Sequence, residues 1–206
     1  MSEEAIIHLV DDDRAASEGL AFMLGSLGLE VRQYQSAEAL LAGLDDSLTA
    51  CIVSDVRMPG MTGLELLDEL QRRACPLPVI LITGHGDVPM AVRAMRAGAM
   101  DFFEKPVNGM ALLERINEAL RQCRSRQALE RDNRALLARV ASLTPREQEV
   151  ARGVLAGKAS KLIAHELGIS LKTVENHRHN GMEKLGVSNV AGMVRLLLAA
   201  GWDAGH

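Results

Sequence analysis

Residues 51–60 read Cys-Ile-Val-Ser-Asp-Val-Arg-Met-Pro-Gly, and the expected fold follows from this stretch. Its first four residues suit a buried strand, a carboxylate comes directly after them, and the proline and glycine mark a loop. The stretch therefore predicts a strand over residues 51–54 that delivers Asp55 to its carboxyl end.

Short apolar runs of this kind recur along residues 1–120, and each is followed by a segment with helical periodicity. Helix starts are marked by Thr62 with Glu65 three residues later, and by Asp87 with Pro89 behind it. Strands that alternate with helices predict an α/β fold with a right-handed, doubly wound, five-stranded parallel sheet. The five strands are expected at residues 6–10, 31–34, 51–54, 79–82 and 99–103.

Polar residues stand where four of these strands end, and ligands bind at that edge of a doubly wound sheet. The residues are Asp11, Asp12 and Asp13, then Asp55, Thr83 and Lys105. Clustered carboxylates without His or Cys suit a hard cation, and Mg²⁺ prefers one or two carboxylates together with waters and phosphate oxygens. Because a carboxylate can accept a phosphoryl group, we expect Mg²⁺ and a phosphoryl group here, with Lys105 and Thr83 stabilising the transferred charge.

The residues at this edge resemble the full signature of two-component receiver domains. The matching pieces are Asp11-Asp12, Asp55-Val-Arg-Met-Pro-Gly60, Thr83-Gly84 and Lys105-Pro106. Residues 84–92 and 94–98 are similar to the FixJ branch of the NarL/FixJ response regulators, a resemblance that implies a flavodoxin-like receiver fold.

The resemblance also implies a role for each residue of the site. Asp55 is then the phosphoacceptor, and Thr83 and Lys105 contact the phosphoryl group. Phe102 is then the switch aromatic, and the peptide bond between Lys105 and Pro106 is cis. The implied ligands of Mg²⁺ are Asp11, Asp12, Asp55 and the backbone carbonyl of Arg57.

Charge separates the two halves of the chain. Residues 1–120 carry 9 Lys and Arg against 19 Asp and Glu, whereas residues 121–139 carry 6 against 2 and residues 140–206 carry 8 against 6. An acidic domain repels phosphate backbones, while a basic connector and tail can approach them. With one Trp and one Tyr the chain has little aromatic surface for stacking single-stranded bases, so duplex DNA remains the candidate.

A capping box marks the start of a second domain, because Thr144 and Glu147 flank Pro145 at a helix start. The next helix is expected to end at Gly168 in the left-handed conformation, and Ser170 caps a third helix. Two helices joined by so short a turn form a helix-turn-helix. The three expected helical segments are residues 144–157, 160–167 and 170–185.

Residues 143–185 look like the LuxR/GerE-type DNA-binding domain, which makes residues 170–185 the recognition helix. The matching residues are Glu147, Leu155, Gly157, Ile163-Ala164, Leu167, Thr173-Val174, His177 and Lys184-Leu185.

Polar residues of the recognition helix gather on one face, opposite Val174, Gly181 and Leu185. The predicted base contacts are Glu175, Asn176 and His179. The predicted phosphate contacts are Lys161, Lys172, Thr173 and Arg178. Glu175 stands where relatives of the domain often have a basic residue, so it is either a cytosine contact or a solvated charge.

The two domains are expected at residues 1–120 and 141–206, with a helical linker at residues 121–140. The helical pattern extends over residues 110–140, but its apolar spacing is irregular and a polar stretch interrupts it. Two interpretations stay open, a continuous signalling helix that pairs with its twin and a frayed linker between two rigid bodies.

Composition excludes several classes of protein. The longest apolar stretches are too short to span a bilayer, and the acidic start at Glu3 and Glu4 is unlike a secretory signal. Three widely spaced cysteines without CxxC pairing indicate neither a disulfide framework nor a zinc site. We therefore expect a cytoplasmic protein without a membrane partner.

Together these features predict a phosphorylation-dependent transcription regulator of a two-component system. A sensor histidine kinase is expected to phosphorylate Asp55, which draws Thr83 toward the phosphoryl group and lets Phe102 turn inward. The phosphorylated chain is expected to form a homodimer, bind double-stranded promoter DNA and activate transcription with RNA polymerase.

Two other classes of protein compete with the regulator, which is expected not to be an enzyme. An aspartate-nucleophile phosphatase usually carries a second Asp two residues after the nucleophile, but Arg57 stands at that position. A phosphate-independent binding protein would use the first domain only as a scaffold, and the complete acidic pocket with Lys105 argues against it.

Overall fold

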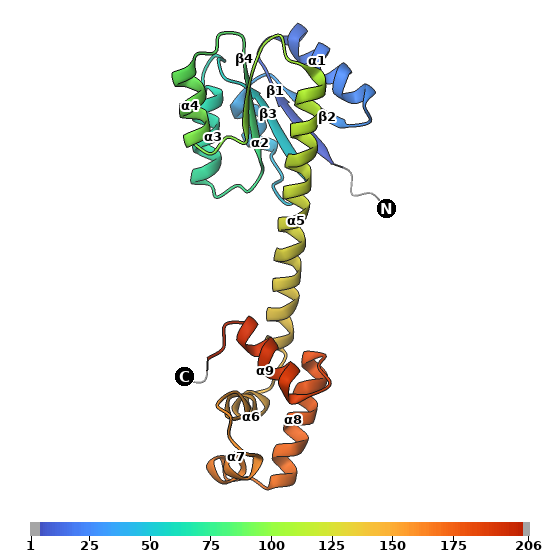
Figure 1. Ribbon diagram of the computed structural model, residues 1–206, viewed down its shortest axis with the longest axis vertical. Coiled ribbons are helices and arrows are strands. Elements are labelled where there is room, and N and C mark those ends of the chain that lie inside the picture. The colour runs from blue at the N-terminus through green and yellow to red at the C-terminus, as the bar shows by residue number, and fades with distance from the viewer. Residues whose placement is uncertain (1–4, 204–206) are drawn as a thin grey trace. The chain divides into compact units, whose positions relative to one another are not determined.

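The computed structural model describes residues 5–203 and divides the chain into two compact units, Met1–Gln127 and Ala128–His206 (Figure 1). The N-terminal unit contains a parallel five-stranded sheet in the order β2-β1-β3-β4-β5, with helices on both faces. This order confirms the predicted doubly wound α/β fold. The strands are β1 (Ile6–Val10), β2 (Glu30–Tyr34), β3 (Ala50–Asp55), β4 (Val79–Thr83) and β5 (Asp101–Glu104).

The last strand, β5, begins two residues later than predicted. Ala99 donates its N–H to the carbonyl of Ala94 at 3.0 Å, behind Gly98 with a φ of +81°. This bond closes the end of the preceding helix, α4 (Val88–Arg96), so Ala99 belongs to the helix terminus and not to the strand.

Four helices connect the strands, and their starts follow the predicted signals. They are α1 (Arg14–Ser26), α2 (Ala37–Gly43), α3 (Gly63–Arg72) and α4 (Val88–Arg96). Thr62 and Glu65 form the capping box of α3, and the Asp87 side chain accepts a hydrogen bond from the N–H of Met90 in α4. Asp13 caps α1 in the same way. These caps satisfy backbone donors that would otherwise lack an intrahelical partner.

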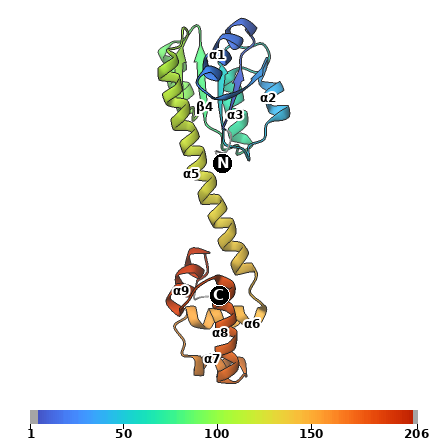
Figure 2. The same ribbon diagram turned by 90° about the vertical axis from the view of Figure 1, so that its right-hand side faces the viewer.

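Successive residues of the strands point into two hydrophobic cores, one on each face of the sheet. On β1, Ile6 and Val10 belong to the core under α2 and α3, while Ile7 and Leu9 belong to the core under α1 and α5 (Gly109–Ala141). Figure 2 shows α5 along one side of the sheet and α2 and α3 on the other. Burial on both faces explains why these strands are continuously apolar in the sequence.

The fifth helix, α5 (Gly109–Ala141), is 33 residues long and helical throughout. Its first half packs on the sheet through Leu112 and Ile116, and near its end Val140 joins a core of the C-terminal unit. The pattern over residues 110–140 thus forms one continuous helix; pairing with a second copy stays a prediction.

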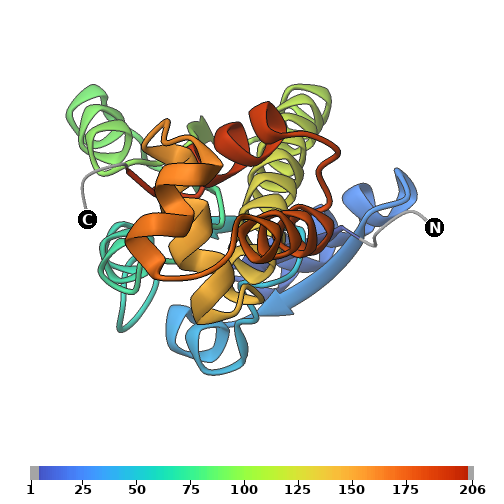
Figure 3. The same cartoon turned by 90° about the horizontal axis from the view of Figure 1, so that it is seen from below.

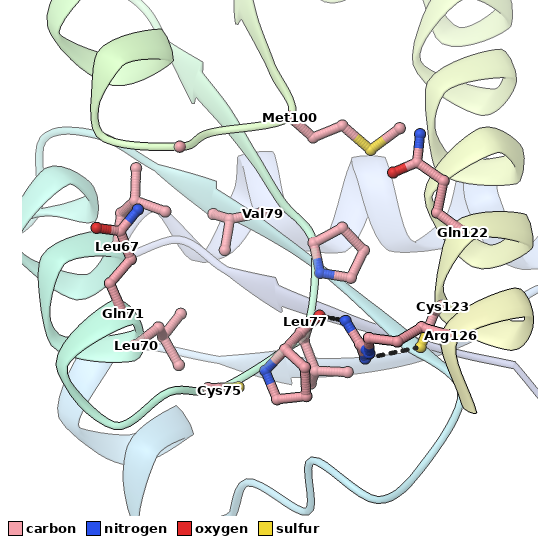
Figure 4. A pocket seen from close by; sticks show the side chains of 13 residues that line it. Leu67, Leu70, Gln71, Cys75, Leu77, Val79, Met100, Gln122, Cys123 and Arg126 are labelled. Carbon is pink, nitrogen blue, oxygen red and sulfur yellow. Dashed lines mark hydrogen bonds between the residues drawn. The ribbon is translucent and has the colours of Figure 1, made fainter. Parts of the chain in front are cut away.

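Some residues of α5 that lie in the predicted linker, residues 121–140, form hydrogen bonds to the N-terminal unit. Thr49 donates its hydroxyl hydrogen to Gln127 Oε1 at 2.9 Å, and Gln127 Nε2 donates to the carbonyl of Ser47 at 3.0 Å. Arg126 donates to the carbonyl of Pro76 beside a cavity of about 500 Å³, lined also by Met100 (Figure 4). These bonds hold α5 against the loops that lead into β3 and β4, and we call them the α5 anchor.

The C-terminal unit contains the end of α5 and four further helices, which run in different directions (Figure 3, orange to red). They are α6 (Pro145–Leu155), α7 (Ser160–Leu167), α8 (Leu171–Leu185) and α9 (Val190–Ala199). Gly168 ends α7 with a φ of +63°, and Ser170 caps α8, as predicted. The fourth helix, α9, was not predicted, although the side chain of Asn189 caps it by accepting from the N–H of Gly192 at 2.8 Å.

Two small cores hold these helices together. The larger core joins α6, α8 and α9 through Ala151, Leu185 and Leu197, and the smaller joins α6, α7 and α8 through Ile163 and Val174. α8 contributes to both cores, so its buried side fixes the direction in which its opposite side faces.

Candidate functional site

The site in the N-terminal unit is built around Asp55 at the carboxyl end of β3. The side chain of Asp55 is buried, and its Oδ1 accepts a hydrogen bond from the N–H of Arg57 at 2.9 Å. Lys105 Nζ lies 2.5 Å from Asp55 Oδ2 and 2.7 Å from Asp11 Oδ2. One ammonium group therefore joins two carboxylates that β1 and β3 bring to the same edge of the sheet.

Burial and these ion pairs act against each other on the charges of the site. Burial raises the pKa of Asp11 above its ordinary value, and the hydrogen bond from Lys105 opposes that rise. For Lys105, burial works to lower the pKa, but the bonds to Asp11 and Asp55 outweigh it and leave the pKa above its ordinary value. Lys105 is therefore held as a cation between the two carboxylates.

Thr83 lies at the carboxyl end of β4, the strand next to β3, and its side chain is buried. Its Oγ1 accepts a hydrogen bond from the N–H of His85 at 3.3 Å, and its carbonyl accepts from the N–H of Lys105 at 2.7 Å. The predicted cis bond between Lys105 and Pro106 is present. The structure thus brings Asp11, Asp55, Thr83 and Lys105 to one edge of the sheet, as the sequence predicts.

The other two residues of the Asp11-Asp12-Asp13 run lie differently. Asp12 is exposed, whereas Asp13 accepts hydrogen bonds from the N–H groups of Ala15 and Ala16 and caps α1. Asp13 also donates its own N–H to Asp11 Oδ1 at 3.0 Å, which fixes the orientation of that carboxylate. The third aspartate is therefore a helix cap.

The donor set of the site fits a magnesium ion. Within residues 5–203 no group of three or more His, Cys, Asp or Glu side chains is placed to hold a metal. Mg²⁺ requires only one or two carboxylates, because waters and phosphate oxygens fill its other positions. Asp11 and Asp55 supply two carboxylates side by side at Lys105, without the softer ligands that select zinc or copper.

Phe102, the predicted switch aromatic, is half-buried on β5 and packs against the core under α2 and α3. A methyl group added to Gly86 would lie 3.2 Å from the Phe102 ring and 3.1 Å from the Thr83 side chain. Gly86, in the loop after β4, therefore lies close to both the Phe102 ring and the methyl group of Thr83.

The predicted DNA-contacting residues fall into two groups in the C-terminal unit. The exposed residues are Lys161 on α7 and Lys172, Glu175, Asn176 and His179 on α8. Thr173 is half-buried, and its hydroxyl lies 2.7 Å from that of Ser170 at the start of α8. Arg178 is half-buried as well, and its Nη1 donates to Ser160 Oγ at 3.1 Å.

An ion pair that was not predicted connects the buried Glu147 of α6 with the exposed Lys184 of α8. Glu147 accepts from Lys184 Nζ at 2.7 Å and from the N–H of Thr144 at 2.8 Å. Burial works to raise the pKa of Glu147, but the bonds from Lys184 and Thr144 hold that pKa below its ordinary value. The capping box could be read from spacing, whereas the partner 37 residues away could not.

An acidic pocket with a central lysine on a doubly wound sheet, joined to a helix-turn-helix, defines the class of response regulators. The family model "Response regulator receiver domain" matches residues 7–117, and "Bacterial regulatory proteins, luxR family" matches residues 141–197. The chain belongs to the response regulators with a LuxR-type DNA-binding domain, and it is a phosphorylation-dependent transcription regulator.

Curated relatives match over nearly the whole chain. The transcriptional regulatory protein FixJ of Bradyrhizobium diazoefficiens is 43% identical, covering 98% of this chain and 98% of the relative. FixJ of Azorhizobium caulinodans is 45% identical, covering 98% and 95%, and the response regulator protein TodT of Pseudomonas putida F1 is 41% identical, covering 95% and 87%. The chain is therefore similar in length and organisation to these regulators.

Solved structures of response regulators also match over nearly the whole chain. The response regulator StyR is 40% identical with a TM-score of 0.88, covering 95% of this chain and 98% of that one. Full-length FixJ from B. japonicum is 42% identical with a TM-score of 0.57, covering 97% and 98%. Over residues 5–203, none of the helices combines the length and the apolar character that a membrane span requires.

Proposed function

We propose that Asp55 accepts a phosphoryl group from a phosphohistidine of a sensor kinase. The bond between phosphorus and the histidine nitrogen breaks as a carboxylate oxygen of Asp55 bonds to phosphorus, and the electron pair leaves with the nitrogen. The observation that carries the proposal is the bridge from Lys105 to both Asp55 and Asp11 at the carboxyl ends of the strands. Lys105 is then in place to stabilise the transferred phosphoryl oxygens, and Thr83 contacts one of them.

Magnesium is the proposed cofactor of this step. The proposed ligands are Asp11, Asp12, Asp55 and the backbone carbonyl of Arg57. Bound there, Mg²⁺ would neutralise charge on the phosphoryl oxygens. The paired carboxylates of Asp11 and Asp55 support this assignment, and Asp12 is exposed at the same edge.

Phosphorylation is proposed to change the surface of the receiver and to promote a homodimer. Thr83 moves toward the phosphoryl group and Phe102 turns inward, which reshapes α4 and β5. A dimer places two helix-turn-helix units on two half-sites of promoter DNA, because the small footprint of one unit gives limited affinity. We propose that the bound dimer activates transcription through RNA polymerase, and that the protein acts in the cytoplasm.

Reading of DNA is assigned to the exposed face of α8. Glu175, Asn176 and His179 are proposed to contact base edges, and their exposure on one face supports this role. Lys161, Lys172 and Thr173 are the proposed phosphate contacts. Arg178 was predicted to belong with them, but its hydrogen bond to Ser160 supports a different role.

The proposed functional division is a receiver at residues 1–120, a linker at residues 121–140 and a DNA-binding domain at residues 141–206. The output of the chain is then binding and not catalytic turnover. Since α5 is continuous across the linker, it is the segment through which the two domains are connected.

Labelling with acetyl phosphate and Mg²⁺ tests this function. Wild type and the control Asp68→Asn, an exposed change on α3, are expected to take up about one phosphoryl group per chain and to dimerise. Asp55→Asn is expected to do neither. Promoter binding that is unchanged in treated Asp55→Asn would refute the switch, and rapid turnover of small phosphate esters would support a phosphatase instead.

A further inference from the structure

The packed side of α8 is a stripe of residues spaced three and four apart. The stripe consists of Val174, Arg178, Gly181 and Leu185. Val174 and Leu185 have no exposed surface, and Gly181 is buried as well. Residues at such spacing share one helix face, so Arg178 lies on the side of α8 that packs against the domain.

The contact that Arg178 makes agrees with this position. Its Nη1 donates to Ser160 Oγ at 3.1 Å, and Ser160 is the first residue of α7. Arg178 Nε is buried and has no hydrogen-bond partner among the residues that the structure describes. One edge of the guanidinium group is therefore enclosed by protein, whereas the side chains of Asn176 and His179 are exposed.

Within residues 5–203, the start of α7 has no hydrogen bond from a capping side chain. Ala159 occupies the position before the helix and has no side-chain oxygen to cap it. By contrast, Thr144, Ser170 and Asn189 cap α6, α8 and α9 through their side chains. The bond from Arg178 is thus a side-chain link between the first turn of α7 and the middle of α8.

We propose that Arg178 is a positioning residue, which sets the angle of α7 on the recognition helix and does not itself contact a DNA phosphate. The inference rests on the proposed reading of DNA by α8. A helix-turn-helix presents its base-contacting residues at the correct depth only when its two helices keep a fixed angle. Loss of the link therefore lowers binding to a specific sequence more than binding to random duplex.

The salt dependence of DNA binding separates this role from a phosphate contact. Each phosphate contact that is removed lowers the slope of log K against log salt by about 0.9. The full-length phosphorylated chain is titrated with a duplex that the wild type has selected from a random library, and with random duplex, between about 50 and 200 mM salt. The variants are Arg178→Gln, Arg178→Lys, Ser160→Ala and the double variant of Ser160→Ala with Arg178→Gln, with Lys172→Gln as the matched control on the exposed face.

Arg178→Gln is expected to weaken binding to the selected duplex about tenfold and to leave the salt slope and the binding to random duplex unchanged. Arg178→Lys keeps the charge but not the planar group, so it is expected not to rescue binding. Ser160→Ala is expected to weaken binding in the same direction, and the double variant to be no worse than Arg178→Gln alone.

A phosphate contact gives the opposite pattern. In that case Arg178→Gln lowers the salt slope by about 0.9, Arg178→Lys restores binding, and Ser160→Ala has no effect, which would overturn the proposal. A general loss of folding would instead weaken selected and random duplex equally, and this too counts against positioning. If Lys172→Gln leaves the slope unchanged, the proposed reading face of α8 fails independently of Arg178.

Discussion

Gly63, the first residue of α3, lies against the backbone carbonyl oxygen of Asp55, so that a methyl group on Gly63 would overlap that oxygen. Gly63 also donates its N–H to the carbonyl of Val56 at 3.0 Å. The chain therefore turns back tightly after β3, and the start of α3 supports the residue that we assign as the phosphoacceptor. Only glycine leaves room for this approach.

Replacing Gly63 with alanine is expected to destabilise the N-terminal unit by about 1–3 kcal/mol, because the backbone of Asp55 must move. Urea unfolding followed by circular dichroism measures the loss, and labelling by acetyl phosphate should slow as well. The control is Gly19→Ala on α1, where an added methyl group meets no atom within 4 Å. Equal urea midpoints for Gly63→Ala and wild type would show that the loop is not tightly constrained.

Replacing Gly181, inside α8, with alanine is expected to stabilise the protein and not to destabilise it. A methyl group there would lie 3.6 Å from Met193 and 3.7 Å from Leu143, which is ordinary van der Waals contact. Gly181→Ala is therefore expected to stabilise the C-terminal unit by up to about 1 kcal/mol through helix propensity. Thermal unfolding of the full chain measures this change. Gly153→Ala is the contrasting variant, because its methyl group would lie 2.8 Å from Ile163 and should destabilise the unit.

The features that were predicted correctly depend on residues close together in the sequence. The capping box of Thr62 and Glu65 spans three residues, and the stop at Gly168 follows directly on its helix. The receiver pocket was predictable over longer distances because parallel strands end at the same edge, so Asp55 and Lys105 had to lie near each other. That prediction depended on the topology of the sheet and not on the spacing between pairs of residues in the sequence.

The features that were missed depend on how helices pack. The pair of Lys184 with Glu147 and the bond from Thr49 to Gln127 join residues 37 and 78 positions apart, which no local pattern encodes. Arg178 is a different case: its phosphate contact stays a prediction, and its spacing from Val174 places it on the packed face of α8. The positive charge of Arg178 favours a phosphate contact, because its neighbours on α8 are proposed to contact DNA. Its position on the helix indicates packing against the domain.

The pair of Glu147 with Lys184 predicts a pH dependence of the C-terminal unit. The folded pKa of Glu147 lies below its ordinary value, so its charged form contributes stability above the unfolded pKa. That contribution is lost as pH falls through the lowered folded pKa. Glu147→Gln should unfold more easily at neutral pH and lose part of this acid dependence. Glu149→Gln, which breaks a surface pair with Arg146, should keep it, and an unchanged pH profile in Glu147→Gln would argue against the pair.

The α5 anchor predicts which turn of α5 is the last one stabilised by hydrogen bonds to the N-terminal unit. Gln127→Ala removes two hydrogen bonds to the segment before β3, each contributing about 1 kcal/mol, so amide exchange in the last anchored turn should rise severalfold. Hydrogen–deuterium exchange of peptides from residues 121–130 measures this. Thr49→Val removes the hydroxyl bond from the other side and should act in the same direction, whereas the exposed change Arg124→Ala should not. Exchange that is equal in all variants would show that helix propensity alone holds the turn.

The carboxylate of Glu175 is expected to affect both the affinity of α8 for DNA and its base preference. Its carboxylate is exposed beside Lys172 and Asn176, where it repels phosphates but can accept a hydrogen bond from the amino group of cytosine. Glu175→Gln is expected to raise the affinity for random duplex and to relax the preference for cytosine at one position by about 1–3 kcal/mol. Selection from a random library, followed by titration of the selected and random duplexes, measures both effects. Glu183→Gln is the control, because it makes the same change at another exposed position near the end of α8. It should alter neither the selected sequence nor the preference for that sequence. If Glu175→Gln selects the same sequence as wild type, its carboxylate is a solvated charge and only the general repulsion remains.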